Sequence, residues 1–432
     1  MRTTFRNRLT DRVSFKSKLL EWAQHYDDVV WLDSNHHNGL YSKYDAILAV
    51  DAFTVLKTDY HGAFKALKEY QSVTDDWLFG YLTYDLKNDI EDLQSRNYDG
   101  VAFSDLYFFQ PKKLFFIKDD TLEMKYLRFV DDEIQSDLDA ILNTTIDHPK
   151  KPDNDDLIKI KLRIHKDDYF DKVNTMLKHI HRGDIYEANF CQEFYSEDVV
   201  LNPISVYNNL NHISKPPFAT FLKCEDNYLL SASPERYLKK DGQKIISQPI
   251  KGTAKRSGNQ HEDEQLRAAL MHDHKERSEN IMIVDLVRND LAHTAKKGTV
   301  KVEELCKVYT FKQVHQMIST ISSEVDIDTH PVDIIESTFP MGSMTGAPKI
   351  SAMKIIETLE ETKRGLYSGA VGYFEPNGDF DFNVIIRSIL YNTSKQYVSY
   401  SVGSAITAKS DPLNEYEECL IKAKAMRQVL EG

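Results

Sequence analysis

The sequence predicts a protein of mixed α and β structure, with a β-rich N-terminal part and a larger C-terminal part. Segments rich in β-branched and aromatic residues, with turn residues between them, fill much of the first 130 residues, and such segments are typical of strands. Residues 166–184 have helical spacing that stops at Gly183. With 432 residues, of which 41% are hydrophobic and 28% charged, the chain is an ordinary globular protein that can bury a sizeable core.

In the N-terminal part we expect strands within residues 45–60 and 98–130. The first twenty residues, rich in Arg, Lys and Thr, are expected to form a short basic helix, with a faint likeness to an organellar transit peptide as the weaker alternative. The stretch "TTIDHPKKPDNDD" is polar and contains proline, which indicates a linker or loop. We therefore expect an N-terminal β-rich subdomain over 1–145, a linker or loop over 146–156 and a C-terminal catalytic domain over 157–432.

In the C-terminal part, two strands over residues 228–250 are expected to form a hairpin around Asp241-Gly242. Residues 261–297 read as one long helix or two short ones, and residues 412–430 as a last helix. The hairpin places Glu235 on one strand and Lys251 at the end of the other, so both side chains are expected to face one cleft.

Composition excludes several classes of protein. The net charge of −13 and the lack of a basic stripe disfavour a nucleic-acid partner. No apolar run approaches the ~18 residues of a membrane span. The four cysteines are scattered, without metal-type spacing, which suits a reducing compartment and predicts a cytoplasmic location.

Two pairs of carboxylates extend apolar helix faces. Glu276 and Glu279 lie at helical spacing from apolar residues, and Glu415 and Glu418 repeat the arrangement with Lys422 one turn further on. Buried carboxylates need neutralisation, and two carboxylates from different helices are a common way to hold Mg²⁺. The alternative, that each pair is solvated at a helix edge, stays open.

Two glycine-containing segments and one arginine could receive an anion. Gly342 and Gly346 precede a helix with Pro348 at its expected first position, and Gly403 is expected in a turn at a strand end. Glycine allows close approach of a ligand to backbone amides, although a tight packing turn explains the first loop equally well. Arg387, expected within an apolar strand, needs an anionic partner, either an internal acid or a substrate carboxylate.

These residues alone suggest a Mg²⁺-assisted enzyme that acts on a small carboxylate-bearing substrate, with Lys251 as a candidate nucleophile. Lys251 stands between an apolar segment and a Gly-Thr turn, where a small apolar residue would serve structure as well.

Six motifs then occur in order over roughly residues 167–428: "SPERYL", "PIKGTAKR", "ENIMIVDLVRNDL", "FPMGSMTGAPKISAMKIIE", "RGLYSGAVGYF" and "NEYEECLIKAKAM". Together they resemble the chorismate-binding enzymes, which include anthranilate synthase component I, aminodeoxychorismate synthase component I, and the isochorismate and salicylate synthases. The resemblance implies an α+β, anthranilate synthase component I-like fold with two subdomains of stacked, mainly antiparallel sheets and outer helices.

Lys251 separates the branches of this family. This chain resembles the aminodeoxychorismate synthase branch, which carries "PIKGT", whereas the other branches carry alanine at the position of the lysine. The resemblance implies that the Lys251 amine attacks C2 of chorismate as the C4 hydroxyl leaves, after which ammonia attacks C4 and expels the lysine. Glu235 resembles the general acid, which benefits from a raised pKa, while the pKa of Lys251 is expected to be depressed.

The same resemblance assigns further site residues. It implies that Glu279 and Glu418 bind Mg²⁺ directly and that Glu276 and Glu415 hold the ion through water. Substrate-binding positions are implied for Gly252, Thr253, His315, Ser343, Tyr367, Arg387, Ala405 and Lys422. Where water-adding members carry a catalytic lysine and amino-transferring members usually carry glutamine, this chain has Glu187, to which we assign no role at this point.

The implied reaction is amination of chorismate to 4-amino-4-deoxychorismate in p-aminobenzoate and folate synthesis. No Gly-x-Cys-x-Gly loop is present, so ammonia is expected from solution or from a separate glutamine amidotransferase subunit. The segments "VVWLDSN" and "YSKYDAILA" resemble the regulatory region of amino-transferring members, where tryptophan is a candidate ligand. Anthranilate synthase component I and a silent regulatory homologue remain the alternatives.

Overall fold

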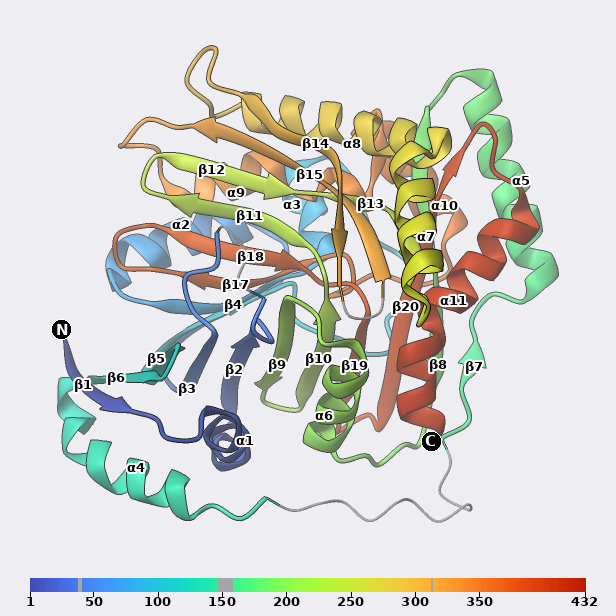
Figure 1. The fold of residues 1–432 in the computed structure, drawn as a ribbon. Coiled ribbons are helices and arrows are strands. Elements are labelled where there is room, and N and C mark those ends of the chain that lie inside the picture. The colour runs from blue at the N-terminus through green and yellow to red at the C-terminus, as the bar shows by residue number, and fades with distance from the viewer. Residues whose placement is uncertain (38–40, 147–157, 312–313) are drawn as a thin grey trace.

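The computed structural model describes residues 1–37, 41–146, 158–311 and 314–432. Within these ranges, twenty strands join into one continuous sheet, and every pair of them is antiparallel. Helices cover the outer faces of the sheet (Figure 1). The predicted α+β class, with mainly antiparallel strands and outer helices, is confirmed.

Two long strands, β3 (Ala46–Thr58) and β5 (Leu106–Lys118), pair along their length and connect two layers of the sheet. From β3 the first layer continues through β2 (Asp28–Asp33), β9 (Phe218–Cys224), β10 (Asn227–Ser233), β19 (Ser388–Asn392), β20 (Tyr397–Thr407) and β8 (Glu187–Ser196). From β5 the second layer continues through β4 (Leu78–Leu82), β17 (Ala370–Phe374), β18 (Phe380–Val384), β11 (Arg236–Asp241), β12 (Lys244–Gln248) and β15 (Val314–Glu324), which also pairs with β13 (Ile250–Lys255) and β14 (Lys301–Thr310).

Short or peripheral strands complete the sheet. They are β1 (Arg2–Arg8), β6 (Thr121–Leu127), β7 (Lys161–Leu162) and β16 (Gly346–Ala347). The pair β1–β6 extends β5 away from the second layer, and β16 pairs with the start of β8.

Alternation of side chains along the strands builds two cores. In β2, Val30 lies in the cluster between the layers, whereas its neighbours Val29 and Trp31 face the outer helices, as the period of two in a strand requires. The helices on the outer face of the first layer are α1 (Arg12–Ala23), α4 (Ile134–Asn143), α5 (Lys166–Arg182), α6 (Pro203–Ser214), α10 (Lys349–Leu359) and α11 (Pro412–Glu431). Those packed on the second layer include α2 (Ala63–Thr74), α3 (Lys87–Ile90), α7 (Gln260–His272), α8 (His274–Ala292) and α9 (Pro331–Thr338).

Several local predictions are confirmed. The hairpin β11–β12 turns at Gly242, whose φ is +60°, and α5 ends at Gly183, whose φ is +88°. Residues 261–297 hold two helices, because the side chain of Asp273 accepts hydrogen bonds from the first amides of α8 and caps a new helix.

Three local predictions are wrong. Residues 2–8 form β1, an edge strand, and the first helix begins only at Arg12. The segment 228–241 is two strands, β10 and β11, which Pro234 separates and which belong to different layers. Pro348 precedes α10 as its N-cap and is not its first residue.

The two predicted subdomains share one sheet. Strand β2 pairs with β9, and β4 pairs with β17, so strands from residues 1–145 lie hydrogen-bonded between strands of the C-terminal part. The predicted linker, residues 146–156, lies outside the described residues except for Ile146. The division of the chain at this point stays a prediction. In the part that the structure describes, no helix is both long and apolar enough to cross a membrane.

Candidate active site

Lys251 lies where the two layers of the sheet approach each other. It belongs to β13 of the second layer, and its Nζ is 3.2 Å from Oε1 of Glu187, which opens β8 of the first layer. Glu235 stands in the short segment between β10 and β11, where the chain crosses from one layer to the other. The fold thus brings together three charged residues that are more than 15 positions apart in the sequence.

Glu235 is a buried acid with a hydrogen-bond donor of its own. Ser343 Oγ donates to Glu235 Oε1 at 2.6 Å, and the Glu235 residue is 4% exposed. Burial raises the pKa of Glu235 to about 7, although the hydrogen bond from Ser343 and the nearby charge of Lys251 oppose this shift. Glu235 is therefore partly protonated near neutral pH, as a general acid requires.

The pKa of Lys251 is shifted in the direction opposite to the expectation. Burial lowers it, but the negative charges of Glu187, Glu279 and Glu235 outweigh burial and raise it above the ordinary value of a lysine. Without a bound cation and substrate, the Lys251 amine is accordingly held as an ammonium ion.

The two carboxylate pairs face each other across Lys275. Its Nζ lies 3.5 Å from Glu415 Oε1 on α11 and 3.8 Å from Glu279 Oε1 on its own helix, α8. Burial raises the pKa of Glu276, and it raises that of Glu279 to about 7. One member of each pair is buried, Glu279 on α8 and Glu415 on α11, so the alternative of two fully solvated pairs does not hold.

The pKa of Glu418 is shifted in the opposite direction to that of Glu276 and Glu279. Burial acts to raise its pKa, but the charge and hydrogen bond of Lys422, whose Nζ is 2.6 Å from Glu418 Oε1, lower it below the ordinary value. Glu418 therefore keeps its negative charge to a lower pH than Glu276 and Glu279, whose pKa values are raised.

These four carboxylates suit a hard divalent cation by their donor chemistry. Across residues 1–37, 41–146, 158–311 and 314–432, no three His, Cys, Asp or Glu side chains already form a group that could hold a metal ion. The cluster nevertheless accommodates positive charge, since the Lys275 ammonium lies between its helices. Glu279 Oε1 is buried and makes no hydrogen bond to another described residue, which leaves a carboxylate oxygen available to a cation.

The glycines of the expected anion loops serve packing. A Cβ on Gly342 would lie 2.7 Å from Leu286 of α8, and one on Gly346 would lie 2.2 Å from the carbonyl oxygen of Glu187. The loop is therefore pressed against α8 and β8, which is the packing alternative. Gly403 lies inside β20 and not in a turn at the end of a strand, and its missing Cβ leaves room for Cys191 Sγ, 2.5 Å from that position.

Arg387 is not within a strand, as expected, but between β18 and β19 with a φ of +54°. Its guanidinium makes no ion pair or hydrogen bond with any residue that the structure describes, and burial lowers its pKa. Together with Lys422 and Gln316 it lines a cleft of about 600 Å³, a volume that includes the open mouth. We call this space the Arg387 cleft.

His315 lies outside the Arg387 cleft, while its neighbour Gln316 lines it. His315 is buried, with Nε2 3.1 Å from Asp263 Oδ1 and Nδ1 3.0 Å from Thr310 Oγ1. Successive side chains of β15 point to opposite faces, so Gln316 turns toward the cleft, where its buried Oε1 has no hydrogen-bond partner. Sequence reasoning missed Gln316; strand alternation could have raised it as the alternative to His315.

The remaining expected substrate positions have distinct surroundings. Tyr367 is buried, with its hydroxyl 3.8 Å from Cys191 Sγ, and Ala405 lies in β20 beside β8. Gly252 has a φ of +92° and approaches Glu276 of α8 so closely that a Cβ would lie 3.1 Å from its Oε2. Thr253 is exposed and pairs with Gln316 in the sheet.

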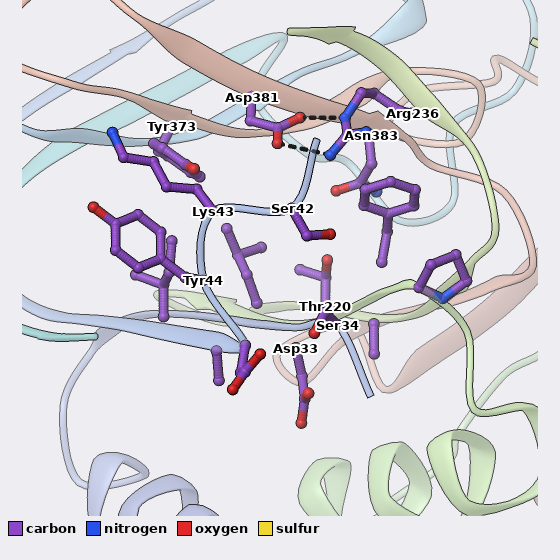
Figure 2. A pocket seen from close by; sticks show the side chains of 17 residues that line it. Asp33, Ser34, Ser42, Lys43, Tyr44, Thr220, Arg236, Tyr373, Asp381 and Asn383 are labelled. Carbon is purple, nitrogen blue, oxygen red and sulfur yellow. Dashed lines mark hydrogen bonds and ion pairs between the residues drawn. The ribbon is translucent and has the colours of Figure 1, made fainter. Parts of the chain in front are cut away.

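A second cavity of about 510 Å³ lies between the layers at the segment "WLDS", and Figure 2 shows the side chains that line it. In this cavity, which we call the Ser34 pocket, Arg236 pairs with Asp381 at 2.9 Å, and Lys43 pairs with Glu375 at 2.6 Å. The buried hydroxyls of Ser34 and Thr220 make no hydrogen bond with any of the described residues.

Comparison with known proteins identifies the family. The model of the family described as chorismate binding enzyme matches residues 27–428. An anthranilate synthase component I-like protein of Synechocystis is 35% identical over 373 residues, which cover 85% of this chain and 75% of that protein. Aminodeoxychorismate synthase component 1 of Bacillus subtilis is 32% identical over 368 residues, which cover 82% of this chain and 76% of that protein.

A solved structure agrees with the architecture. Anthranilate synthase component I from Streptococcus pneumoniae has a TM-score of 0.77 at 24% identity, over 91% of this chain and 94% of that one, which bears on the fold alone. The names of the two relatives differ, but the family match does not depend on them. It covers nearly the whole chain and includes every residue of the site described above. The chain therefore belongs to the chorismate-binding enzyme family.

Proposed function

We propose that this chain is component I of an aminodeoxychorismate synthase, which converts chorismate and ammonia to 4-amino-4-deoxychorismate. The observation that carries the proposal is the buried amine of Lys251, 3.2 Å from Glu187 and close enough to Glu235 to oppose the rise of its pKa. A nucleophile and a general acid in one site are what a two-step displacement requires.

The proposed reaction begins with Lys251 in its neutral form. Its nitrogen forms a bond to C2 of chorismate, the double bond shifts, and the C4–O bond breaks. Glu235 gives its proton to the departing hydroxyl, which leaves as water. Ammonia then forms a bond to C4 while Lys251 leaves C2, and the surplus proton of the new amine returns to Glu235.

Positive charge for the substrate carboxylates comes from two places in this proposal. Arg387, without an ion-pair partner among the described residues, and Lys422 line the cleft, and a bidentate guanidinium suits a carboxylate. A bound Mg²⁺ would supply further charge opposite a carboxylate. The residues proposed to hold the ion are Glu279 and Glu418 directly and Glu276 and Glu415 through water.

The test is a product assay with purified chain, chorismate, Mg²⁺ and an ammonium salt, followed by chromatography and mass spectrometry. We expect a 4-amino product that an added lyase converts to p-aminobenzoate. Fluorescent anthranilate would instead assign the chain to the anthranilate synthase branch, which the name of the Synechocystis relative favours. No turnover with ammonia would favour a silent homologue.

Ammonia is proposed to come from a separate glutamine amidotransferase subunit or from solution. All four cysteines are free and buried, and none stands in a Gly-x-Cys-x-Gly loop. The dependence of turnover on glutamine, with and without an added amidotransferase subunit, tests this partner. The cytoplasmic location stays a prediction.

The Ser34 pocket is proposed to bind a free amino acid, with tryptophan as the first candidate. Its free hydroxyls and its paired charges could receive an amino acid's ammonium and carboxylate groups. A rise of the melting temperature with added tryptophan, absent with leucine, is the expected result.

A further inference from the structure

Glu187 is the carboxylate in contact with the proposed nucleophile. Among the described residues, it is the one acid with an oxygen within 4 Å of Lys251 Nζ, at 3.2 Å. The Glu187 side chain is 2% exposed and that of Lys251 13%. The second oxygen, Oε2, is buried and makes no hydrogen bond within the part of the chain that the structure describes, so among these residues Lys251 is the donor that holds Glu187.

The main chain of Glu187 is fixed on both sides. It pairs with Ala347 of β16 and with Thr407 of β20. A Cβ on residue 346 would lie 2.2 Å from the Glu187 carbonyl oxygen. Glycine at this position therefore allows β16 to pack closely against Glu187. Because the backbone is clamped between two strands, the side chain has little freedom except along its own rotamers, and it points at Lys251.

The other two carboxylates around Lys251 have tasks of their own. Glu235 must hold a proton for the leaving hydroxyl, and Ser343 donates to it. Glu279 belongs to the carboxylate cluster on α8 and α11, next to Lys275. Of the acids that face Lys251, this leaves Glu187 to accept the proton that the amine must lose.

We infer that Glu187 holds the Lys251 amine in position and accepts its proton when the amine becomes a nucleophile. This inference rests on the proposed function, in which Lys251 attacks the substrate. One N–H bond of the Lys251 ammonium group breaks and an O–H bond forms on Glu187. The electron pair left on the nitrogen then forms the bond to C2 of chorismate. Transfer within the pair leaves both partners uncharged, so no net charge is created in a buried site.

The experiment follows the covalent adduct between Lys251 and the substrate. Enzyme, chorismate and Mg²⁺ are mixed without ammonia, quenched with acid at set times, and measured by intact mass and peptide mapping. We compare wild type with Glu187→Gln, which keeps the size and one acceptor oxygen but takes no proton. Adduct formation is expected to be roughly 10²-fold slower or more in this variant at pH 6.5, as is typical of lost acid–base catalysis.

The pH dependence separates proton transfer from simple support. In Glu187→Gln the proton must go to solvent, so adduct formation should rise with pH between 5.5 and 6.5 by up to about tenfold, while wild type stays nearly flat. A slow but equally flat profile would overturn the assignment of the proton. Equal rates in both proteins would overturn the inference as a whole.

Two further variants guard against a structural explanation. Glu193→Gln is the matched control, since Glu193 is also buried on β8 and pairs with Arg163 at 3.1 Å; it should form adduct at the wild-type rate even if its melting temperature falls. Glu187→Asp keeps the charge but withdraws the carboxylate, and should form adduct more slowly than wild type with a flat pH profile. A wild-type rate in Glu187→Asp would contradict the positioning role.

One outcome tests the proposed function and not the inference about Glu187. If wild type forms no adduct yet aminates C4, the proposed role of Lys251 as nucleophile is wrong, whatever the Glu187 variants do.

Discussion

The candidate active site and the Ser34 pocket are both lined by the two layers of the sheet, and Pro217 lines the Arg387 cleft as well as the pocket. Their charges are arranged differently. In the pocket, Arg236 and Lys43 each have a carboxylate partner within 3 Å, as Figure 2 shows for Arg236 and Asp381. In the active site, Arg387 has no ion-pair partner among the described residues, and the pKa of Glu235 and of Glu279 is raised to about 7.

The different arrangement of charges suits the two cavities to different tasks. Groups with displaced pKa values and unpaired charges are characteristic of sites where protons and charge move. Paired charges with two free hydroxyls suit a site that packs or binds without chemistry. We therefore expect turnover at the candidate active site and, at most, recognition of a ligand in the Ser34 pocket.

The largest effect is expected from Lys251→Ala. If Lys251 is the nucleophile, its removal should lower the rate of C4 amination by roughly 10³-fold or more, as measured by chromatography and mass spectrometry of the products. Lys307→Ala serves as the control, because Lys307 is an exposed lysine paired only locally with Glu304. Unchanged C4 amination in Lys251→Ala would show that Lys251 is not the nucleophile and that the candidate active site differs less from the Ser34 pocket than its charges indicate.

A smaller effect is expected from Glu279→Gln. Loss of a proposed Mg²⁺ ligand should raise the Mg²⁺ concentration needed for half-maximal activity by roughly 10- to 100-fold. Asp285→Asn is the matched control on the same helix, since Asp285 is 65% exposed and its ion pair is the local one with Arg288. Equal Mg²⁺ dependence in both variants would remove Glu279 from the metal site.

The raised pKa of Glu235 predicts two pH effects. Activity should fall by up to about tenfold per unit as the pH rises above 7, because the acid then lacks its proton. The folded pKa of about 7 lies above the ordinary 4.5, so Glu235 contributes stability that is present below pH 4.5 and lost as the pH rises through 7. The gap between the two values corresponds to roughly 3 kcal/mol. Chemical unfolding of wild type and Glu235→Gln from pH 4 to pH 8 measures this loss, and parallel curves would contradict it.

The smallest effect is expected in the Ser34 pocket. Ser34→Ala removes a buried hydroxyl without a hydrogen bond, so the free energy of unfolding should change by less than about 1 kcal/mol and turnover should be unaffected. If the pocket binds tryptophan, the stabilisation of the protein by tryptophan should shrink in this variant. A large loss of turnover would show that the two cavities are not separate in function.

Local features were predictable from the sequence because their physical causes are local. Gly183 ends a helix and Gly242 turns a hairpin with positive φ values that glycine alone adopts readily. The carboxylate pairs of α8 and α11 share helix faces because their spacing matches the helical repeat. These features depend on neighbours in sequence, and so does the capping of α8 by Asp273.

Features that depend on strand pairing were not predictable in the same way. Gly403 looks like a turn residue, but it packs against Cys191 within β20. His315 and Gln316 are adjacent, and only the face on which α7 packs decides which of them reaches the cleft. The contact between Lys251 and Glu187 joins residues of different layers, so no spacing in the sequence indicates it.

The interleaving of N-terminal strands with C-terminal ones has a consequence for how the chain folds. Strand β2 pairs with β9, about 190 positions later, and β4 pairs with β17, about 290 positions later. Contacts of such long sequence separation form slowly. During synthesis, the edge of β2 would stay unpaired until β9 had emerged from the ribosome, and the edge of β4 until β17 had emerged. Open edges of this kind invite pairing with other chains, so fragments that end before residue 370 are expected to aggregate when they are produced alone.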